Sequence, residues 1–284
     1  MKILFTTDLC VDRGHYARLT EAARATQPDL IILGGNALPK DMAITPQAMG
    51  IEQPNFVRTE FPDILQRVRS AAGGAPICLV HGNLDWGSTA TAMQEIAAQG
   101  HVTVLSHTEP HRANGLTLLG YGCTPPTDGF VKDFERLDRA ADRPPLLGGG
   151  RWDPRFKRVA THGAAVMFAK FGSMEADLAK LSTPAEPWVF VAYAPPNGTA
   201  LDRAHTGESR GSHAIRAVIE RHRPFLSLHG HLTDHLKGGG RVQDQIGSTV
   251  AVNVGQSAAV LHYGLIEVDP AAGKVISVVA GQQR

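Results

Sequence analysis

Five polar residues stand just after apolar runs of the kind that form buried strands. They are Asp8, Asn36, Asn83, Tyr193 and His231. The carboxyl ends of parallel strands meet at one edge of a sheet, so we expect these side chains to form a single site there. A carboxylate, an imidazole, amides and a phenol can bind an ion or hydrogen-bond to one another. The spacing therefore predicts a polar site and leaves both chemistries open.

The first hundred residues alternate strand and helix patterns that would position such a site. Strands are expected at Lys2–Thr7, Leu30–Leu33 and Ile77–His81, and helices at about Tyr16–Thr26, at Phe61–Ala72 and from Ser88 to Gln99. Residues 35–60 contain three prolines, which predicts an irregular rim or lid. The order indicates an α/β chain with parallel crossovers.

The pattern changes in the second half of the chain. Asn114-Gly115 predicts a hairpin joining Val102–Leu105 to Leu116–Leu119, and residues 121–150 read as a long surface excursion. Further elements are expected at Met174–Leu181, Val189–Tyr193, His213–Arg223 and Leu226–His229, followed by antiparallel strands at Val250–Asn253, Val260–Val268 and Val275–Val278. Two sheets packed as a sandwich with helices outside account for this order.

Composition limits the function classes. The chain has 284 residues, is 43% hydrophobic and carries a formal net charge of +1, which predicts no nucleic-acid and no membrane partner. Three cysteines without a CxxC pair favour a reducing cytoplasm over a disulfide framework. No signal segment or run of about 20 apolar residues is present. These features predict a cytoplasmic protein.

Several motifs in order resemble those of the calcineurin-like metallophosphoesterases. The motifs are the Asp after the first strand, GGN after the second, GNLD after the third, then APPNGT and GHLT. Three stretches between them, at 125–138, 211–224 and 246–256, look like a bacterial and archaeal branch of that family. The resemblance implies a four-layer α-β-β-α sandwich with mixed sheets, formed by one domain over residues 1–284.

The resemblance also implies roles for single positions. Asp8, Asn36, Asn83 and His231 stand where the family has metal ligands, although the family has Asp at position 36. Four further positions carry substitutions for a family His: Cys10, Leu84, Tyr193 and Thr233. In the family, two divalent metals activate a water against phosphorus, and the His at position 84 would assist the leaving group. Leu84 cannot transfer a proton, so no catalytic residue is assigned.

These substitutions leave one carboxylate and one imidazole, too little negative charge for two transition metals. We therefore expect a degraded dinuclear site, weak or no catalysis, and action by binding, with a phosphate ester or another anion as the ligand. No tightly bound cofactor is expected, and at most one weakly held Mn, Mg, Zn or Fe ion. The alternative is an active phosphoesterase or phosphodiesterase that uses a single metal on Asp8, Asn36, Asn83 and His231, so the enzyme question stays open.

If the scaffold is kept without cations, the polar atoms need other partners. We expect direct or one-water hydrogen bonds linking Asp8, Asn36, Asn83 and His231, with Tyr193 at the edge of the network.

Other reactive residues fit structural roles better. Cys10 has no adjacent base in the sequence and is expected to be buried and inert. His81 and His229 could share a face with the site, but histidines bonded to backbone in a core are commoner. Asp85 is expected to cap the next helix or to form an ion pair. The GGGR runs at 148–151 and 238–241 lack the Lys-Ser/Thr ending of a phosphate loop and read as flexible loops.

Overall fold

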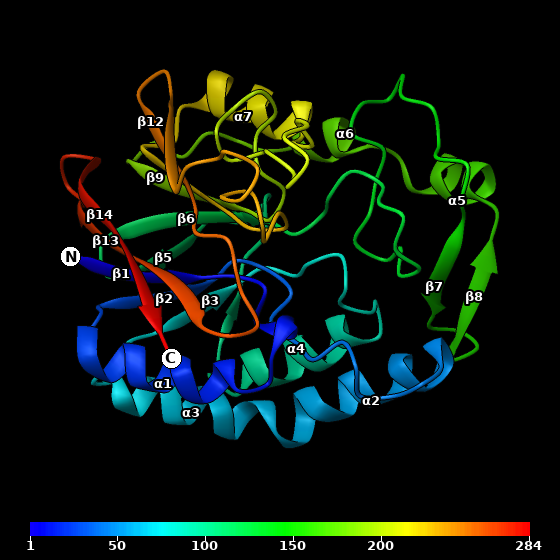
Figure 1. Ribbon diagram of the computed structural model, residues 1–284, viewed down its shortest axis with the longest axis horizontal. Helices are drawn as coiled ribbons and strands as arrows, with labels where there is room; N and C mark the ends of the chain where they lie inside the picture. The colour runs from blue at the N-terminus through cyan, green and yellow to red at the C-terminus, as the bar shows by residue number, and fades with distance from the viewer.

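Two six-stranded sheets lie face to face in the computed structural model, which describes all residues from Met1 to Arg284 (Figure 1). The first sheet has the order β14-β13-β1-β2-β3-β4, and the second has the order β11-β12-β10-β9-β6-β5. Both sheets are mixed: the first has antiparallel pairs only at its β14–β13–β1 side and is parallel from β1 to β4, whereas the second has an antiparallel pair at each edge. The predicted mixed α/β class is confirmed.

The strands of the first sheet are β1 (Lys2–Thr6), β2 (Leu30–Leu33), β3 (Ile77–Leu79), β4 (Thr103–Val104), β13 (Leu261–Asp269) and β14 (Lys274–Gln283). Those of the second are β5 (His111–Ala113), β6 (Leu116–Tyr121), β9 (Trp188–Ala192), β10 (Leu226–His229), β11 (Gln243–Ile246) and β12 (Thr249–Asn253). A third, two-stranded sheet joins β7 (Gly149–Asp153) to β8 (Arg158–His162).

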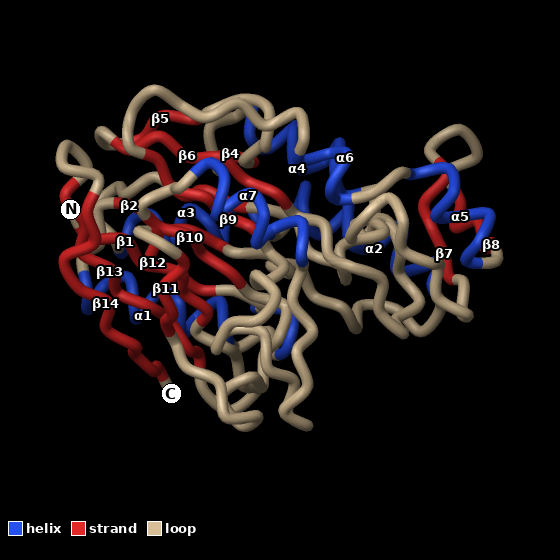
Figure 2. The backbone as a smooth tube through the Cα atoms, turned by 90° about the horizontal axis from the view of Figure 1, so that it is seen from above, coloured by secondary structure: helices blue, strands red, loops and turns tan.

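Helices cover the outer face of each large sheet. The first is covered by α1 (His15–Thr26), α2 (Pro46–Thr59), α3 (Phe61–Ala71) and α4 (Thr89–Ala98), and the second by α6 (Met174–Leu178) and α7 (His213–His222) (Figure 1). The remaining helix, α5 (Ala164–Phe171), lies beside β7 and β8 at one end of the molecule (Figure 2). A short 3-10 turn, Leu9–Val11, follows β1.

Strand alternation divides the core into three slabs, because successive side chains point to opposite faces. Leu4, Ile31 and Leu79 belong to a 25-residue cluster under α1–α4. Ile3, Phe5 and Ile32 belong to a 19-residue cluster between the two sheets. A 17-residue cluster lies between the second sheet and α6 and α7. Helices, sheet, sheet and helices form the predicted four layers.

Residues 46–59 are helical, so the prediction of an irregular segment over 35–60 is wrong in its second half. Thr45 accepts a hydrogen bond from the amide of Ala48, and Pro46 stands at the first helical position, where its missing N–H is not needed. Pro54 lies inside the helix and is buried. Burial of one face outweighs the proline that argued against a helix.

Three strand predictions also need correction. Thr103–Val104 pairs parallel with β3, and the hairpin around Asn114-Gly115 joins β5 to β6 instead. Both hairpin residues have positive φ (51° and 81°), as the tight turn requires. Thr249–Asn253 pairs antiparallel with β11, as predicted for the end of the chain, but also parallel with β10. The surface excursion is predicted without a strand or helix of its own, whereas its end and the residues after it contain β7, β8 and α5.

Candidate functional site

The five polar residues follow β1, β2, β3, β9 and β10 and meet at one place. Asp8, Asn36 and His231 have left-handed backbone, with φ of 55°, 48° and 67°. The amide of Asp8 donates to the carbonyl of Gly35 (2.9 Å), and the amide of Cys10 donates to the carbonyl of Asn36 (3.0 Å). These bonds hold the loops after β1 and β2 against each other, so the side chains converge as predicted.

The Asp8 carboxylate accepts four hydrogen bonds. Tyr193 donates its hydroxyl (2.6 Å) and Asn36 its amide (3.2 Å) to Oδ1. Thr7 donates its hydroxyl (2.9 Å) and His231 its backbone amide (3.1 Å) to Oδ2. A carboxylate offers about four lone-pair sites, so both oxygens are saturated. Burial raises the pKa of Asp8 even though these four bonds favour the charged form.

The Asn36 amide is oriented by the chain that follows β3. The amide of Leu84 donates to Asn36 Oδ1 (2.9 Å), which turns Nδ2 towards Asp8 and Asn83. Nδ2 also contacts the Tyr193 hydroxyl oxygen. At position 36 an amide therefore supplies protons to acceptors that an aspartate could only repel.

Tyr193 lies at the centre of the network, so the prediction that it stands at the edge is wrong. Its hydroxyl contacts Asp8, Asn36 and Asn83, the last at 3.3 Å. The side chain is fully buried, and its ring packs against Gly35, where a Cβ would lie 2.2 Å from the ring. Burial and the nearby Asp8 raise the pKa of Tyr193 well above its ordinary value, so the phenol stays neutral.

His231 joins the network through its backbone. Its amide bonds to Asp8, whereas its ring packs edge-on against Tyr193 with 5.3 Å between ring centroids. The imidazole makes no hydrogen bond, and burial lowers its pKa to about 4. The predicted hydrogen bonds therefore link Asp8, Asn36 and Asn83 through side chains and His231 through its main chain.

Two glycines let the backbone approach these side chains closely. A Cβ on Gly82 would lie 2.3 Å from Asn36 Oδ1, and one on Gly230 would lie 2.0 Å from Thr7 Oγ1. Thr7 is a site residue that the motifs do not mark, although its hydroxyl stands directly before Asp8 in the sequence. Two glycines and one threonine therefore complete the close packing.

The other family positions lie beside the network without joining it through side chains. Cys10 is buried, and burial raises the pKa of its thiol well above the ordinary value, as expected for an inert cysteine. Leu84 contributes only its amide. Thr233 accepts a backbone hydrogen bond from the amide of Gln256 (2.8 Å).

The histidines that could have rebuilt a site have other partners. His229 contacts the carbonyls of Ala192 and Ala194 through Nδ1 (2.9 and 3.0 Å), and Ser227 through Nε2 (2.7 Å). It is the backbone-bonded core histidine that the sequence favoured. His81 stacks on Phe134 with 4.5 Å between centroids, and no hydrogen bond reaches its buried Nδ1.

Asp85 does not cap the next helix, so that alternative is wrong. Its Oδ2 accepts from the amide of Gly82 (2.8 Å) and lies 3.7 Å from His81 Nδ1. The N-cap residue of α4 is Ser88. Asp85 therefore closes the turn that carries Asn83.

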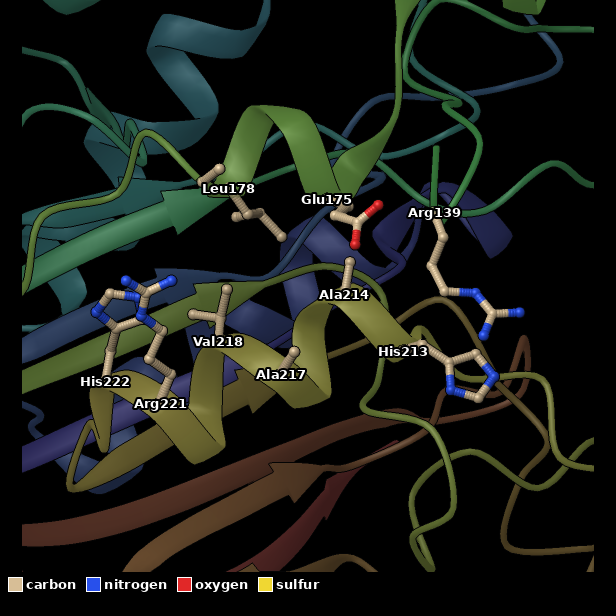
Figure 3. Close-up of a pocket in the computed structure, with 10 residues that line it drawn as sticks. Arg139, Glu175, Leu178, His213, Ala214, Ala217, Val218, Arg221 and His222 are labelled. Atoms are coloured by element: carbon tan, nitrogen blue, oxygen red, sulfur yellow. The ribbon is translucent and has the colours of Figure 1, made fainter. Parts of the chain in front are cut away.

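A separate groove lies between α6 and α7 and has a volume of about 350 Å³ (Figure 3). Arg139, Glu175, His213 and Arg221 stand around an apolar floor that includes Val218. It shares no residue with the Asp8 network. The groove is therefore not part of the candidate site.

The comparisons with known proteins agree with this fold. The family model for calcineurin-like phosphoesterases matches residues 1–233. The chain belongs to the calcineurin-like phosphoesterase family. The comparison with curated proteins found no match.

Solved structures give the same result for the fold alone. One crystal structure superposes with a TM-score of 0.64 at 16% sequence identity, covering 100% of this chain and 99% of the other. The crystal structure of TT1561 from Thermus thermophilus superposes with a TM-score of 0.58 at 17% identity, covering 100% and 99%.

The residues present do not fit the metal pair that the family usually binds. No group of three or more His, Cys, Asp or Glu side chains comes close enough to hold a metal ion. Asp8, the one carboxylate of the network, already has a donor at each lone-pair site. The donor set is therefore complete without a cation.

Proposed function

We propose that this chain is a calcineurin-like phosphoesterase family member without a dinuclear metal centre, acting by binding rather than by hydrolysis. The observation that carries the proposal is the saturation of the Asp8 carboxylate by four donors. A cation at this position would have to displace donors that are themselves buried. Each displaced buried donor would cost about 1–3 kcal/mol.

The charge of the site supports the same conclusion. Two divalent cations a few ångströms apart need anionic ligands to offset their repulsion. Asn36 and Asn83 are neutral, and burial keeps the pKa of Tyr193 well above its ordinary value. Asp8 alone cannot supply the missing charge.

Leu84 supports the absence of hydrolysis independently of metal. By family resemblance this position would carry the proton donor for the leaving oxygen, and an isobutyl group has no proton to give. General acid catalysis typically contributes about 10²–10⁴-fold to a rate. Residual turnover is expected to be low even if an ion binds.

The test is hydrolysis of a generic aryl phosphodiester by protein supplemented with Mn²⁺ or Ni²⁺. We expect barely detectable turnover, and a rate within about tenfold of an ordinary enzyme's ~10 s⁻¹ would contradict the proposal. Elemental analysis after dialysis without chelator is the second readout. Two metals per chain would also contradict it.

A variant with the family residues restored provides the matched control. It carries Cys10→His, Asn36→Asp, Leu84→His, Tyr193→His and Thr233→His. We expect it to take up more metal than the unchanged chain, because the substitutions return the anionic and imidazole ligands. If the restored variant binds no more metal than the unchanged chain, the substituted ligands do not account for the metal content of the site.

If the unchanged chain proves active, the single-metal alternative makes its own prediction. Asp8→Ala and His231→Ala should then abolish turnover, whereas Cys10→Ala should matter less. The two hypotheses are thus separated by the same assay.

The ligand class that we propose is a phosphate ester or another anion, as family membership suggests. For location we propose the cytoplasm, which is supported by three buried cysteines that are all free. No helix of the chain is both long and apolar enough to cross a bilayer.

A further inference from the structure

The net charge of +1 hides a strong local asymmetry. Residues 143–171 contain six of the chain's 28 Lys and Arg residues and one of its 27 Asp and Glu residues. This segment comprises the end of the excursion together with β7, β8 and α5, and we call it the basic lobe. Figures 1 and 2 both show β7, β8 and α5 at one end of the molecule, standing off from the two large sheets.

Five of the six cations of the basic lobe face solvent. Arg143, Arg155, Lys157, Arg158 and Lys170 are all exposed. Only Arg155 has an acidic partner, Asp153, at 3.6 Å. Arg143, Lys157, Arg158 and Lys170 therefore carry exposed positive charges without an acidic partner.

Large apolar side chains of the basic lobe are exposed as well. Leu146, Leu147, Phe156 and Val166 are 62–101% exposed, and they are four of the ten exposed large hydrophobic residues in the chain. Phe156 lies between Arg155 and Arg158, whose guanidinium carbons are 5.7 and 5.2 Å from the ring centroid. Exposed apolar groups of this size are unfavourable in water and mark a candidate binding surface.

A hollow of about 440 Å³ lies between the β7–β8 hairpin and α5. Arg155, His162 and Lys170 line it together with Met167 and Phe171. Its lining thus combines cations with apolar walls, as does the outer surface of the lobe.

The basic lobe is held firmly on the body. Asp133 accepts from the amide of Gly87 (2.8 Å) in the loop after β3, and from the amide of Trp152 (3.1 Å) in β7. Arg151 is buried, donates to the carbonyls of Lys132, Asp133 and Glu135, and stacks on Phe171 at 3.5 Å. These contacts hold β7 and α5 in place on the body of the protein.

We propose that the basic lobe docks on a bilayer rich in anionic phospholipid. Lys and Arg neutralise the headgroup charge while Phe156, Leu146, Leu147 and Val166 enter the boundary of the acyl chains. This goes beyond the proposed function and does not depend on it. A fluid surface suits apolar side chains spread over separate turns, because it needs no fixed complementary shape.

Other occupants fit less well. Two copies facing each other through this lobe would oppose like charges. A nucleic acid would neutralise the cations but would leave the aliphatic groups of Leu146 and Val166 without apolar contact. An acidic protein would have to supply apolar pockets at several separate points.

The test is flotation of the full chain with vesicles of phosphatidylcholine alone, or of phosphatidylcholine with phosphatidylglycerol. We expect binding only to the vesicles that contain phosphatidylglycerol, and weaker binding as salt rises. Arg155→Gln with Arg158→Gln should reduce partitioning by about fivefold for each cation lost. Phe156→Ser should reduce it by about tenfold.

The matched control is Arg24→Gln with Arg67→Gln, which removes two exposed charges from α1 and α3. Arg24 pairs with Glu21 much as Arg155 pairs with Asp153. We expect the control to bind as the unchanged chain does. An equal loss in the control, salt-independent binding, or binding to DNA or polyglutamate but not to vesicles would overturn the proposal.

Discussion

Replacing Asn36 with Asp would restore the family's residue and should destabilise the folded protein. Asn36 Nδ2 lies 3.2 Å from Asp8 Oδ1 and 3.3 Å from Asn83 Oδ1. Oδ1 of Asn36 is held by the amide of Leu84 at 2.9 Å, so the new oxygen must take the place of Nδ2. Asn36→Asp therefore turns a donor that faces acceptors into another acceptor.

The size of the effect follows from two competing responses. Two charged oxygens 3.2 Å apart repel by about 5 kcal/mol at an effective dielectric constant of about 20. Alternatively, one carboxyl keeps a proton, which at pH 7 costs about 4 kcal/mol for a group that titrates near 4 when unfolded. The chain takes the cheaper response, so we expect a loss of about 3–5 kcal/mol at pH 7.

The sign of the pH dependence follows from the same argument. The folded variant binds one proton more than the unfolded variant, so its deficit shrinks as pH falls towards the unfolded carboxyl pKa. Urea unfolding of the variant and the unchanged chain at pH 7 and pH 5 measures both quantities. The control is Asn55→Asp, an exposed position whose side chain makes no hydrogen bond, where we expect a change within about 1 kcal/mol. A loss below about 1 kcal/mol for Asn36→Asp, or a deficit that grows on acidification, would refute the orientation assigned to the Asn36 amide.

Three further predictions concern buried polar groups. Tyr193→Phe should lower the free energy of unfolding by about 1–3 kcal/mol, because it leaves buried partners unsatisfied. The control Tyr263→Phe should change it by less than about 0.5 kcal/mol. Equal losses in urea unfolding would contradict the central place of Tyr193. Burial lowers the pKa of His229 to about 4, so the unfolded chain takes up a proton near pH 6.5 before the folded one does, and stability should fall as pH drops from 6.5 to 4. His229→Gln should reduce the slope of the free energy of unfolding against pH by the equivalent of about one proton. An unchanged slope would mean that other groups cause the pH dependence. Lys132 and Glu135 form a fully buried ion pair at 2.7 Å, so Lys132→Met should cost about 3–5 kcal/mol. Adding Glu135→Leu should recover much of that loss, and no recovery would mean that packing, rather than charge, sets the cost.

Much of the fold could be predicted because the central strands are continuous apolar runs. Leu30–Leu33 and Leu226–His229 begin and end as predicted, since a strand buried on both faces leaves little ambiguity. The side-chain caps of α6 and α7, Ser173 and Ser212, were also visible in the sequence. The polar residues after the strands then had to converge.

The basic lobe could not be predicted in the same way. Strand β7 contains two glycines and two charged residues, and β8 contains only two apolar residues, so neither shows the apolar run that predicts a buried strand. Helix α2 contains two prolines, a residue that normally argues against a helix, so the sequence pattern did not predict it. In the site, the direction of the Asn36 amide depends on a backbone donor at Leu84, 48 residues away, which spacing cannot reveal.

The left-handed backbone of Asp8, Asn36 and His231 limits which side chains these three positions can carry. At such φ values most side chains are strained, while Asn and Asp are tolerated. Position 36 differs from the family pattern only by the exchange of Asp for Asn, the change that this conformation permits most easily. Cys10, Leu84, Tyr193 and Thr233 do not have positive φ, and these positions carry the larger chemical changes. The dihedral angles of the loops therefore restrict the site: residues that differ most in chemistry from the family pattern stand only where the backbone imposes no penalty.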